Sequence, residues 1–182
     1  MPPEVVPIVD SNLPIAELLL YSTMTLATSD HDGEPHAAAV YFATDDNLDF
    51  YFFSDLHSQY GQDLAIRPQC AIAIYPECQD WRDIRGLQLR GDARPIQPGQ
   101  KWEYAWSAYR AKFSFVSEMR ELVVRNQFYM FIPTWVRLVD NRIGFGFKQE
   151  WRRLMQMGDS TQPSWQRLGD TSAESGAGLD RA

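Results

Sequence analysis

The sequence predicts a mainly β domain of the α+β class, an antiparallel β-barrel of six to seven strands with flanking helices. Three observations predict this fold. Short alternating or apolar segments recur along the chain, hairpin signals such as Asp32-Gly33 separate them, and strand–helix–strand alternation is too rare for a doubly wound sheet. We therefore expect most of the chain to be one barrel whose strands are joined by short turns.

The bulk composition fits one packed globular domain. The 182 residues are enough for a hydrophobic core, and 45% of them are apolar and 13% aromatic. The formal charge of −7, from 24 acidic and 17 basic residues, argues against a general nucleic-acid partner. The longest apolar run, residues 37–43, is too short to cross a bilayer, so we expect no membrane partner.

The N-terminus and the cysteines indicate a cytoplasmic protein. Residues 1–4 read Met-Pro-Pro-Glu, without the basic and apolar regions of a signal peptide. Cys70 alternates with isoleucines on an expected strand, which is typical of a core residue. Together with three scattered histidines, Cys70 and Cys78 do not form a familiar zinc spacing, so we expect no metal and a reducing compartment.

Residues 1–21 are expected to form an extended arm and a short helix. Ser11 or Asn12 can cap that helix, and Ile15 and Leu18 lie on one of its faces. The barrel domain is then expected over residues 22–154. Its first strands are predicted at residues 24–28, 35–43 and 48–53, with turns at 30–33 and 45–47.

A short helix and two strands follow. The helix is expected over residues 57–66 and stops before a proline, because proline disfavours helical geometry in the residue before it. Residues 69–75 alternate as a strand. A longer strand over residues 84–96 contains Gly86 and Gly91 as candidate bends or bulges.

The second half of the domain is expected to begin with helices, from residue 98 to about residue 125. An aromatic stripe on one helical face indicates core packing or a subunit interface. The stripe consists of Trp102, Trp106, Tyr109 and Phe113. Strands at residues 127–139 and 142–147 are expected to pair with each other. Residues 155–182 are polar and are expected to be a disordered tail.

The expected strand at residues 142–147 combines glycines with large apolar residues. Gly144 and Gly146 flank Phe145, and Lys148 follows. Glycine inside a strand often marks close approach by another backbone or a ligand. A flat group or a second subunit against this strand, and a glycine-kinked strand at a barrel corner, are both compatible with the pattern.

The best candidate site lies between the second expected strand and the helix that follows the third. Residues 36–41 carry a run of small side chains, which either lets a planar ring approach or makes room for a helix. Ser54, Ser58 and the free amides of the helix start suit a phosphate, although most helix starts bind only water. His36 and His57 can donate to a phosphate or a ring oxygen, or serve only as local hydrogen-bonding residues.

Several motifs in and after this segment resemble the pyridoxamine 5'-phosphate oxidase-like, FMN-binding split-barrel superfamily. They are the strand at residues 36–41, the pair Phe53-Ser54, the helix start at 57–61, and the segments 67–74 and 84–91. Residues 140–148 are more similar to its poorly characterised YhbP-like bacterial branch. The resemblance covers roughly residues 22–154 and implies an antiparallel split β-barrel. It also implies a homodimer with two FMN sites at the subunit interface.

The resemblance implies where FMN would lie. The flavin ring would follow the strand near residues 38–41, and the phosphate would sit by the end of the next strand and the helix start. Arg142 would come from the neighbouring subunit or close the same site. The implied cofactor-binding residues are His36, Ala38, Ala39, Val40, Tyr41, Phe53, Ser54, Ser58, Gln59, Tyr60 and Arg142. No catalytic residue is assigned.

This sequence departs from the oxidase pattern at the phosphate. Oxidase members carry Arg or Lys on that strand and at the helix start, where this chain has Tyr41, Gln59 and Tyr60. Cations hold a phosphate dianion best, so FMN binding should be weaker unless another cation substitutes. The cations available for this are Arg67, Arg85, Arg142 and Lys148. Val139 also replaces the histidine of an Arg-Leu-His-Asp element, which argues against pyridoxamine 5'-phosphate oxidation itself.

We therefore expect a cytoplasmic, dimeric flavoprotein that binds FMN and passes electrons to an unidentified small molecule, the cofactor supplying the redox chemistry. Two alternatives remain open. One is a non-enzymatic protein of the same fold that holds flavin, coenzyme F420 or haem. The other is a structural dimer without a cofactor, whose aromatic stripe forms the interface.

Overall fold

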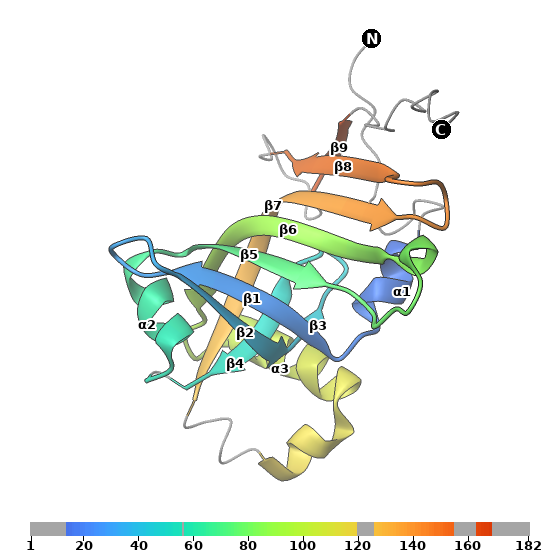
Figure 1. The fold of residues 1–182 in the computed structure, drawn as a ribbon. Coiled ribbons are helices and arrows are strands. Elements are labelled where there is room, and N and C mark those ends of the chain that lie inside the picture. Colours follow the sequence, from blue (N-terminus) through green and yellow to red (C-terminus); the bar gives the residue numbers. More distant parts are fainter. Residues whose placement is uncertain (1–13, 56, 120–125, 155–162, 169–182) are drawn as a thin grey trace, which may run out of the picture.

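Antiparallel pairing organises the structure, a computed structural model that describes residues 14–55, 57–119, 126–154 and 163–168 (Figure 1). Every strand pairing in these ranges is antiparallel, and the strands form a single curled sheet that closes like half a barrel. A few short helices flank it. The expected fold class is confirmed.

The sheet has a main path and a side branch. The main path runs in the order β2 (Pro35–Tyr41), β1 (Thr23–Ser29), β5 (Gln69–Ile74), β6 (Arg85–Pro95), β7 (Gln127–Asp140), β4 (Phe50–Ser54) and β3 (Ala43–Thr44). The branch consists of β8 (Lys148–Arg153), which pairs with β7, and β9 (Trp165–Leu168), which pairs with β8.

The helices lie around the sheet. They are α1 (Ile15–Leu19), α2 (Gln59–Ile66) and α3 (Gln100–Lys112), with short 3-10 helices η1 (Trp81–Asp83) and η2 (Ser114–Met119). In Figure 1, α1 and α2 lie at opposite ends of the sheet. None of the helices in the described ranges has the length and apolar character needed to cross a bilayer.

Strand β7 connects the two halves of the barrel. One of its edges pairs with β6 from end to end, whereas the other pairs with β4 over its first residues and with β8 over its last. The register between β6 and β7 shifts between Arg90 and Gly91. A Cβ atom on Gly91 would lie 2.1 Å from the Ile132 carbonyl oxygen, so this bulge requires glycine.

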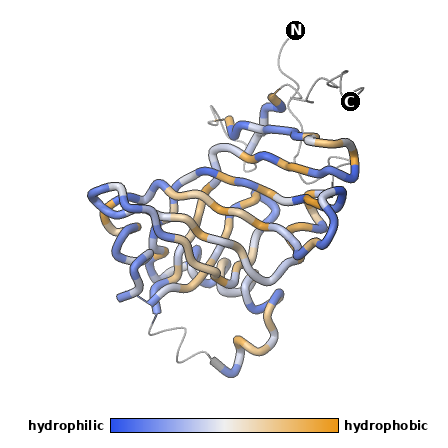
Figure 2. Tube along the Cα trace, viewed as in Figure 1, coloured by the Kyte–Doolittle hydropathy of each residue, from blue (hydrophilic) through white to orange (hydrophobic). Residues whose placement is uncertain are grey.

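Two apolar clusters hold the sheet together. Inside the barrel, Leu26, Phe50 and Leu89 are at most 1% exposed. On the other side, the stripe of α3 packs against Phe53 and Phe128, whose rings stack at 4.0 Å. The stripe is therefore a core feature within one chain. Figure 2 shows hydrophobic colour along the inner strands and hydrophilic colour on the β1–β2 turn.

The expected strand at residues 142–147 is wrong, because these residues form a loop between β7 and β8. The buried carboxylate of Asp140 accepts a hydrogen bond from the Arg142 backbone N–H and two from its guanidinium. The Asn141 side chain accepts one from the Gly146 N–H, and Gly146 has a φ of 71°. The polar residues thus fold the segment into turns, and glycine serves the left-handed position.

Two other boundaries differ from the sequence prediction. The expected strand over residues 35–43 breaks at Phe42, whose side chain is buried. Up to Tyr41 the strand pairs with β1, and from Ala43 it continues as β3, which pairs with β4. Strand β9 lies inside the tail that was expected to be disordered, and Trp165 is 3% exposed there. The possible caps Ser11 and Asn12 lie outside the described residues. The same holds for residues 155–162 and 169–182 of that tail.

We expect Gly91→Ala to lower the free energy of unfolding by about 1–3 kcal/mol, because the new methyl group meets backbone atoms of β7 that cannot rotate away. Urea denaturation of both proteins measures the loss. Gly144→Ala is the matched control, since no heavy atom lies within 4 Å of the position that its new methyl group would take. Equal losses at the two glycines would show that the β6–β7 bulge does not depend on residue 91.

Candidate functional site

Strand alternation divides the residues predicted to contact the flavin ring between two faces of β2. Val40 is buried in the core and Ala38 packs against it, while His36 reaches a buried carboxylate. Ala39 and Tyr41 point to the opposite, exposed face. Because successive residues of a strand face opposite sides, one ring can contact only half of the predicted set.

The serines at the start of α2 are engaged within the chain. Ser58 is the N-cap of α2, and its hydroxyl accepts a hydrogen bond from the Gly61 N–H at 3.2 Å. Ser54 is 1% exposed, and its hydroxyl oxygen lies 2.8 Å from that of Ser58. Both hydroxyls lie within 2.8 Å of the Asp55 carbonyl oxygen. Both serine hydroxyls therefore have partners within the chain, and the Gly61 N–H is capped without a ligand. The other predicted residue nearby, Phe53, packs under α3.

Three of the four cations that could replace the missing phosphate ligands are held elsewhere, and the fourth, Lys148, lies on β8 opposite Val139. Arg67 follows the last residue of α2 and donates to Ser29, at the far end of that helix. Arg85 binds Glu17, and Arg142 binds Asp140 with Glu17 3.7 Å away, so both belong to the α1 end of the sheet. Within one chain the structure therefore does not bring Arg142 to the other predicted residues.

A buried carboxylate, Asp63, lies within α2, one turn after Gln59. Its oxygens accept hydrogen bonds from the Thr28 hydroxyl at 2.6 Å and the Gln59 amide at 3.0 Å, and His36 Nδ1 lies 2.8 Å away. Burial raises the pKa of Asp63, but these hydrogen bonds and His36 outweigh it and hold the pKa below its ordinary value. An ionised carboxylate here disfavours a phosphate at the same place.

The Asp63 cluster joins α2 to the β1–β2 hairpin. Sequence reasoning singled out His36 and Gln59 but missed Thr28 and Asp63. The spacing of Gln59 and Asp63 by four residues, one helical turn, is the signal that could have suggested a shared hydrogen bond. Tyr60, also predicted for the phosphate, packs against the main core.

The outer face of the sheet offers a different site. Its small side chains on β2, β1 and β5, which we call the shelf, are Ala37, Ala39, Thr25, Ala27, Ala71 and Ala73. The register aligns them in two rows that continue into larger residues on β6 and β7, Ala37–Ala27–Ala71–Arg90–Trp135 and Ala39–Thr25–Ala73–Gln88–Arg137. Two adjoining hollows of about 450 Å³ each lie over this face and share Ala27, Ala71 and Arg90.

The shelf ends at an indole flanked by two guanidinium groups. The guanidinium carbon of Arg90 lies 4.2 Å from the Trp135 ring centre, and that of Arg137 lies 4.8 Å from it. Glu150 binds Arg137 at 2.7 Å and accepts a hydrogen bond from the Trp135 N–H at 3.1 Å. Sequence reasoning missed Trp135. The strand alternation that places it beside Arg90 was visible, but the pairing register was not.

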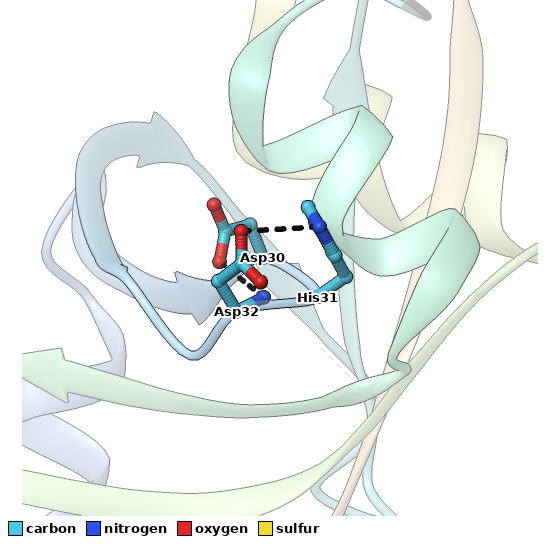
Figure 3. Close-up of side chains that lie close together, drawn as sticks. All are labelled: Asp30, His31 and Asp32. Carbon is cyan, nitrogen blue, oxygen red and sulfur yellow. Dashed lines mark hydrogen bonds and ion pairs between the residues drawn. The ribbon is translucent and has the colours of Figure 1, made fainter.

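Three side chains in the β1–β2 turn come close together without forming a convincing metal centre (Figure 3). The ligand atoms of Asp30, His31 and Asp32 lie within 4.8 Å of one another at the surface. The Asp30 carboxylate already accepts hydrogen bonds from the Asp32 and Glu34 N–H groups, both at 2.9 Å. This side chain therefore closes the turn, which is a common role of aspartate.

Comparison with known proteins assigns the chain to a protein family. A family model described as pyridoxamine 5'-phosphate oxidase matches residues 16–139. The chain belongs to this family. It is 26% identical over 130 residues to a UPF0306 protein of Photorhabdus laumondii, a match that covers 71% of this chain and 87% of that protein. The superfamily expected from the motifs is thus confirmed.

Several solved structures share the fold of this chain. A heme binding protein from Mycobacterium smegmatis has a TM-score of 0.62 and 21% identity, covering 72% of this chain and 52% of that chain. A pyridoxamine 5'-phosphate oxidase-related, FMN binding protein from Nostoc punctiforme has a TM-score of 0.58 and 16% identity, covering 85% and 90%. The match to the Polynucleobacter asymbioticus pyridoxine/pyridoxamine 5'-phosphate oxidase spans only 37% of that enzyme.

We expect Asp63→Ala to lower the free energy of unfolding by about 1–3 kcal/mol at neutral pH, because Thr28 and His36 lose their buried acceptor. The pKa of Asp63 is lower in the folded than in the unfolded state. Its contribution to the stability of the fold is therefore complete above the unfolded pKa of about 3.9 and is lost as the pH falls through the folded pKa. Denaturation curves from pH 7 to pH 3 should show the difference from wild type shrinking below about pH 4.

Asp32→Ala serves as the control for the Asp63 experiment, because the Asp32 side chain is 71% exposed and pairs with His31, which is itself 70% exposed. It should change stability little at any pH. A loss as large as that of Asp63→Ala, or a loss at Asp63 that does not depend on pH, would contradict the assigned role of the buried carboxylate.

Proposed function

We propose that this chain binds a flat, conjugated cofactor on the outer face of its sheet, with FMN as the first candidate, and that it passes electrons to a small molecule. The observation that carries this proposal is the shelf, which ends at the stacked pair Arg90 and Trp135. Small side chains let a planar ring approach the sheet closely, and an indole with a cation suits the edge of an anionic ring system.

The ring and the phosphate of FMN fit different parts of this molecule. From β2 to β6 the outer face spans three strand spacings, ~14 Å, which is wide enough for a fused ring. The start of α2 does not suit the phosphate, because its hydroxyls are engaged within the chain and the buried carboxylate of Asp63 contacts Gln59 one turn along the same helix. When bound, a flavin supplies reversible electron acceptance, and the protein's residues position the ring and shield it from water.

We also propose that a second copy of the chain covers part of the outer face. Strand β2 is an edge strand whose outer side chains are exposed, and Tyr41 and Phe115 beside it are about half exposed. Exposed aromatic rings of this kind are common at interfaces. The homodimer that the resemblance implies is consistent with this face, and sedimentation of the purified protein tests it.

A second candidate function is cofactor binding without turnover, for example of haem. The neutral residues Tyr41, Gln59 and Tyr60 at the family's phosphate site favour a ligand other than FMN. A fold neighbour from Mycobacterium smegmatis is described as a heme binding protein. The two candidates differ in one measurement, since only the oxidoreductase should oxidise NADH or NADPH in the presence of bound flavin and an electron acceptor.

The test is the visible absorption spectrum of the protein after incubation with FMN, and separately with haemin, followed by gel filtration. We expect about one cofactor retained per chain for one of the two ligands. Ala71→Leu should abolish retention, because its side chain fills the floor shared by both hollows. Ala65→Leu, at an exposed position of α2, is the matched control and should bind like the wild type.

Two results would contradict the proposed function. A colourless wild-type protein that retains neither cofactor would exclude both candidates. Equal retention by the Ala71→Leu and Ala65→Leu variants, each checked for folding by circular dichroism, would move the cofactor away from the shelf.

A further inference from the structure

The outer face carries a cation that is positioned by an aromatic ring but makes no direct ion pair in the described residues. Arg90 lies directly opposite Trp135 in the β6–β7 register, and its guanidinium stacks on the indole at 4.2 Å. In the described part of the chain no carboxylate lies within ion-pair distance of it, and the carboxylate that acts on it electrostatically, Glu150, is directly paired with Arg137. Stacking fixes the plane of a guanidinium while leaving its in-plane N–H donors free.

Two ion pairs beside Arg90 engage the charged groups nearest to it. Arg137 is bound by Glu150 at 2.7 Å, and Asp92, which lines the second hollow, is 3.3 Å from Arg94. The face around Arg90 therefore keeps a positive charge on a chain whose formal charge is −7. An arginine that has no direct ion pair and is held flat at the edge of a hollow is suited to a planar or tetrahedral oxyanion.

We infer that Arg90, held on Trp135, binds the oxyanion of the shelf ligand, whether that is the phosphate of a flavin or a carboxylate of a porphyrin. This inference rests on the proposed function for the location of the flat ring. It assigns the anionic end of the ligand to β6 and β7, and not to the start of α2. Arg90 lines both hollows together with Ala27 and Ala71. One ligand can therefore place its ring over these alanines and its oxyanion at Arg90.

The geometry also explains why arginine is needed. A guanidinium stacked at 4.2 Å can offer two parallel N–H donors to one oxyanion, whereas a lysine ammonium offers a point charge without a fixed plane. Arg90→Lys should therefore keep only part of the binding. Trp135→Leu should weaken it as well, because the guanidinium loses the surface that orients it.

The experiment compares ligands that differ only in the anion. Dissociation constants are measured for two ligand pairs, FMN with riboflavin and a porphyrin dicarboxylate with its dimethyl ester. The proteins are the wild type, Arg90→Gln and Arg110→Gln. Wild type should bind the anionic member of the accepted pair about tenfold to hundredfold more tightly. Arg90→Gln should remove this preference and leave the neutral member unaffected. Arg110→Gln removes an exposed cation of α3 that lines neither hollow, and it should preserve the preference.

Each outcome separates this inference from the proposed function. A preference that persists in Arg90→Gln would overturn the inference while leaving cofactor binding intact. If wild type binds none of the four ligands, the proposed function fails. The inference is then decided by titrating inorganic phosphate against the Arg90 side-chain N–H signal in NMR spectra. A saturable shift that disappears in Trp135→Leu would support it, and an unchanged signal would overturn it.

Discussion

The pairing of β6 with β7 is the constraint on which the rest of the structure depends. The Ile132 carbonyl oxygen approaches residue 91 so closely that only glycine fits, and the bulge at this point bends both strands. The bend lets one edge of β7 pair with β4 and then with β8, so that both halves of the barrel share a single strand. The same register sets Arg90 against Trp135 and thereby assembles the outer face.

Two buried carboxylates fix the ends of this frame. Asp63 binds α2 to the first hairpin, and Asp140 holds Arg142 and the β7–β8 loop. Burial raises the pKa of Asp140, but the hydrogen bonds and charge of Arg142 outweigh it and hold the pKa below its ordinary value. Ser58, Gln59 and Arg142 look like ligand-binding residues in the sequence, yet in one chain all three serve the fold. A polar residue at a helix start or in a turn has unsatisfied backbone and side-chain groups to pair before it can serve a ligand.

The sequence was sufficient for what depends on local pattern. Alternation located β1 and β5 to within two residues, and the helical spacing of Trp106 and Tyr109 indicated the buried face of α3. It failed where partners are distant along the chain. His36 and Asp63 are 27 residues apart, and no local signal pairs them. The shelf also could not be predicted, because the register that aligns Ala37, Ala27 and Ala71 is a property of three strands together.

The charge on the outer face limits what can cover it. Taking an unpaired guanidinium out of water costs several kcal/mol unless an opposite charge compensates it. A second copy of the chain laid on the shelf would therefore have to bring a carboxylate to Arg90, or leave room there for an anionic ligand. Arg137 shows the first solution within the chain, because Glu150 neutralises it. Glu150 is directly paired with Arg137, and no carboxylate of the described residues makes an ion pair with Arg90. Dimer formation and ligand binding on this face therefore favour each other if the ligand supplies the missing charge.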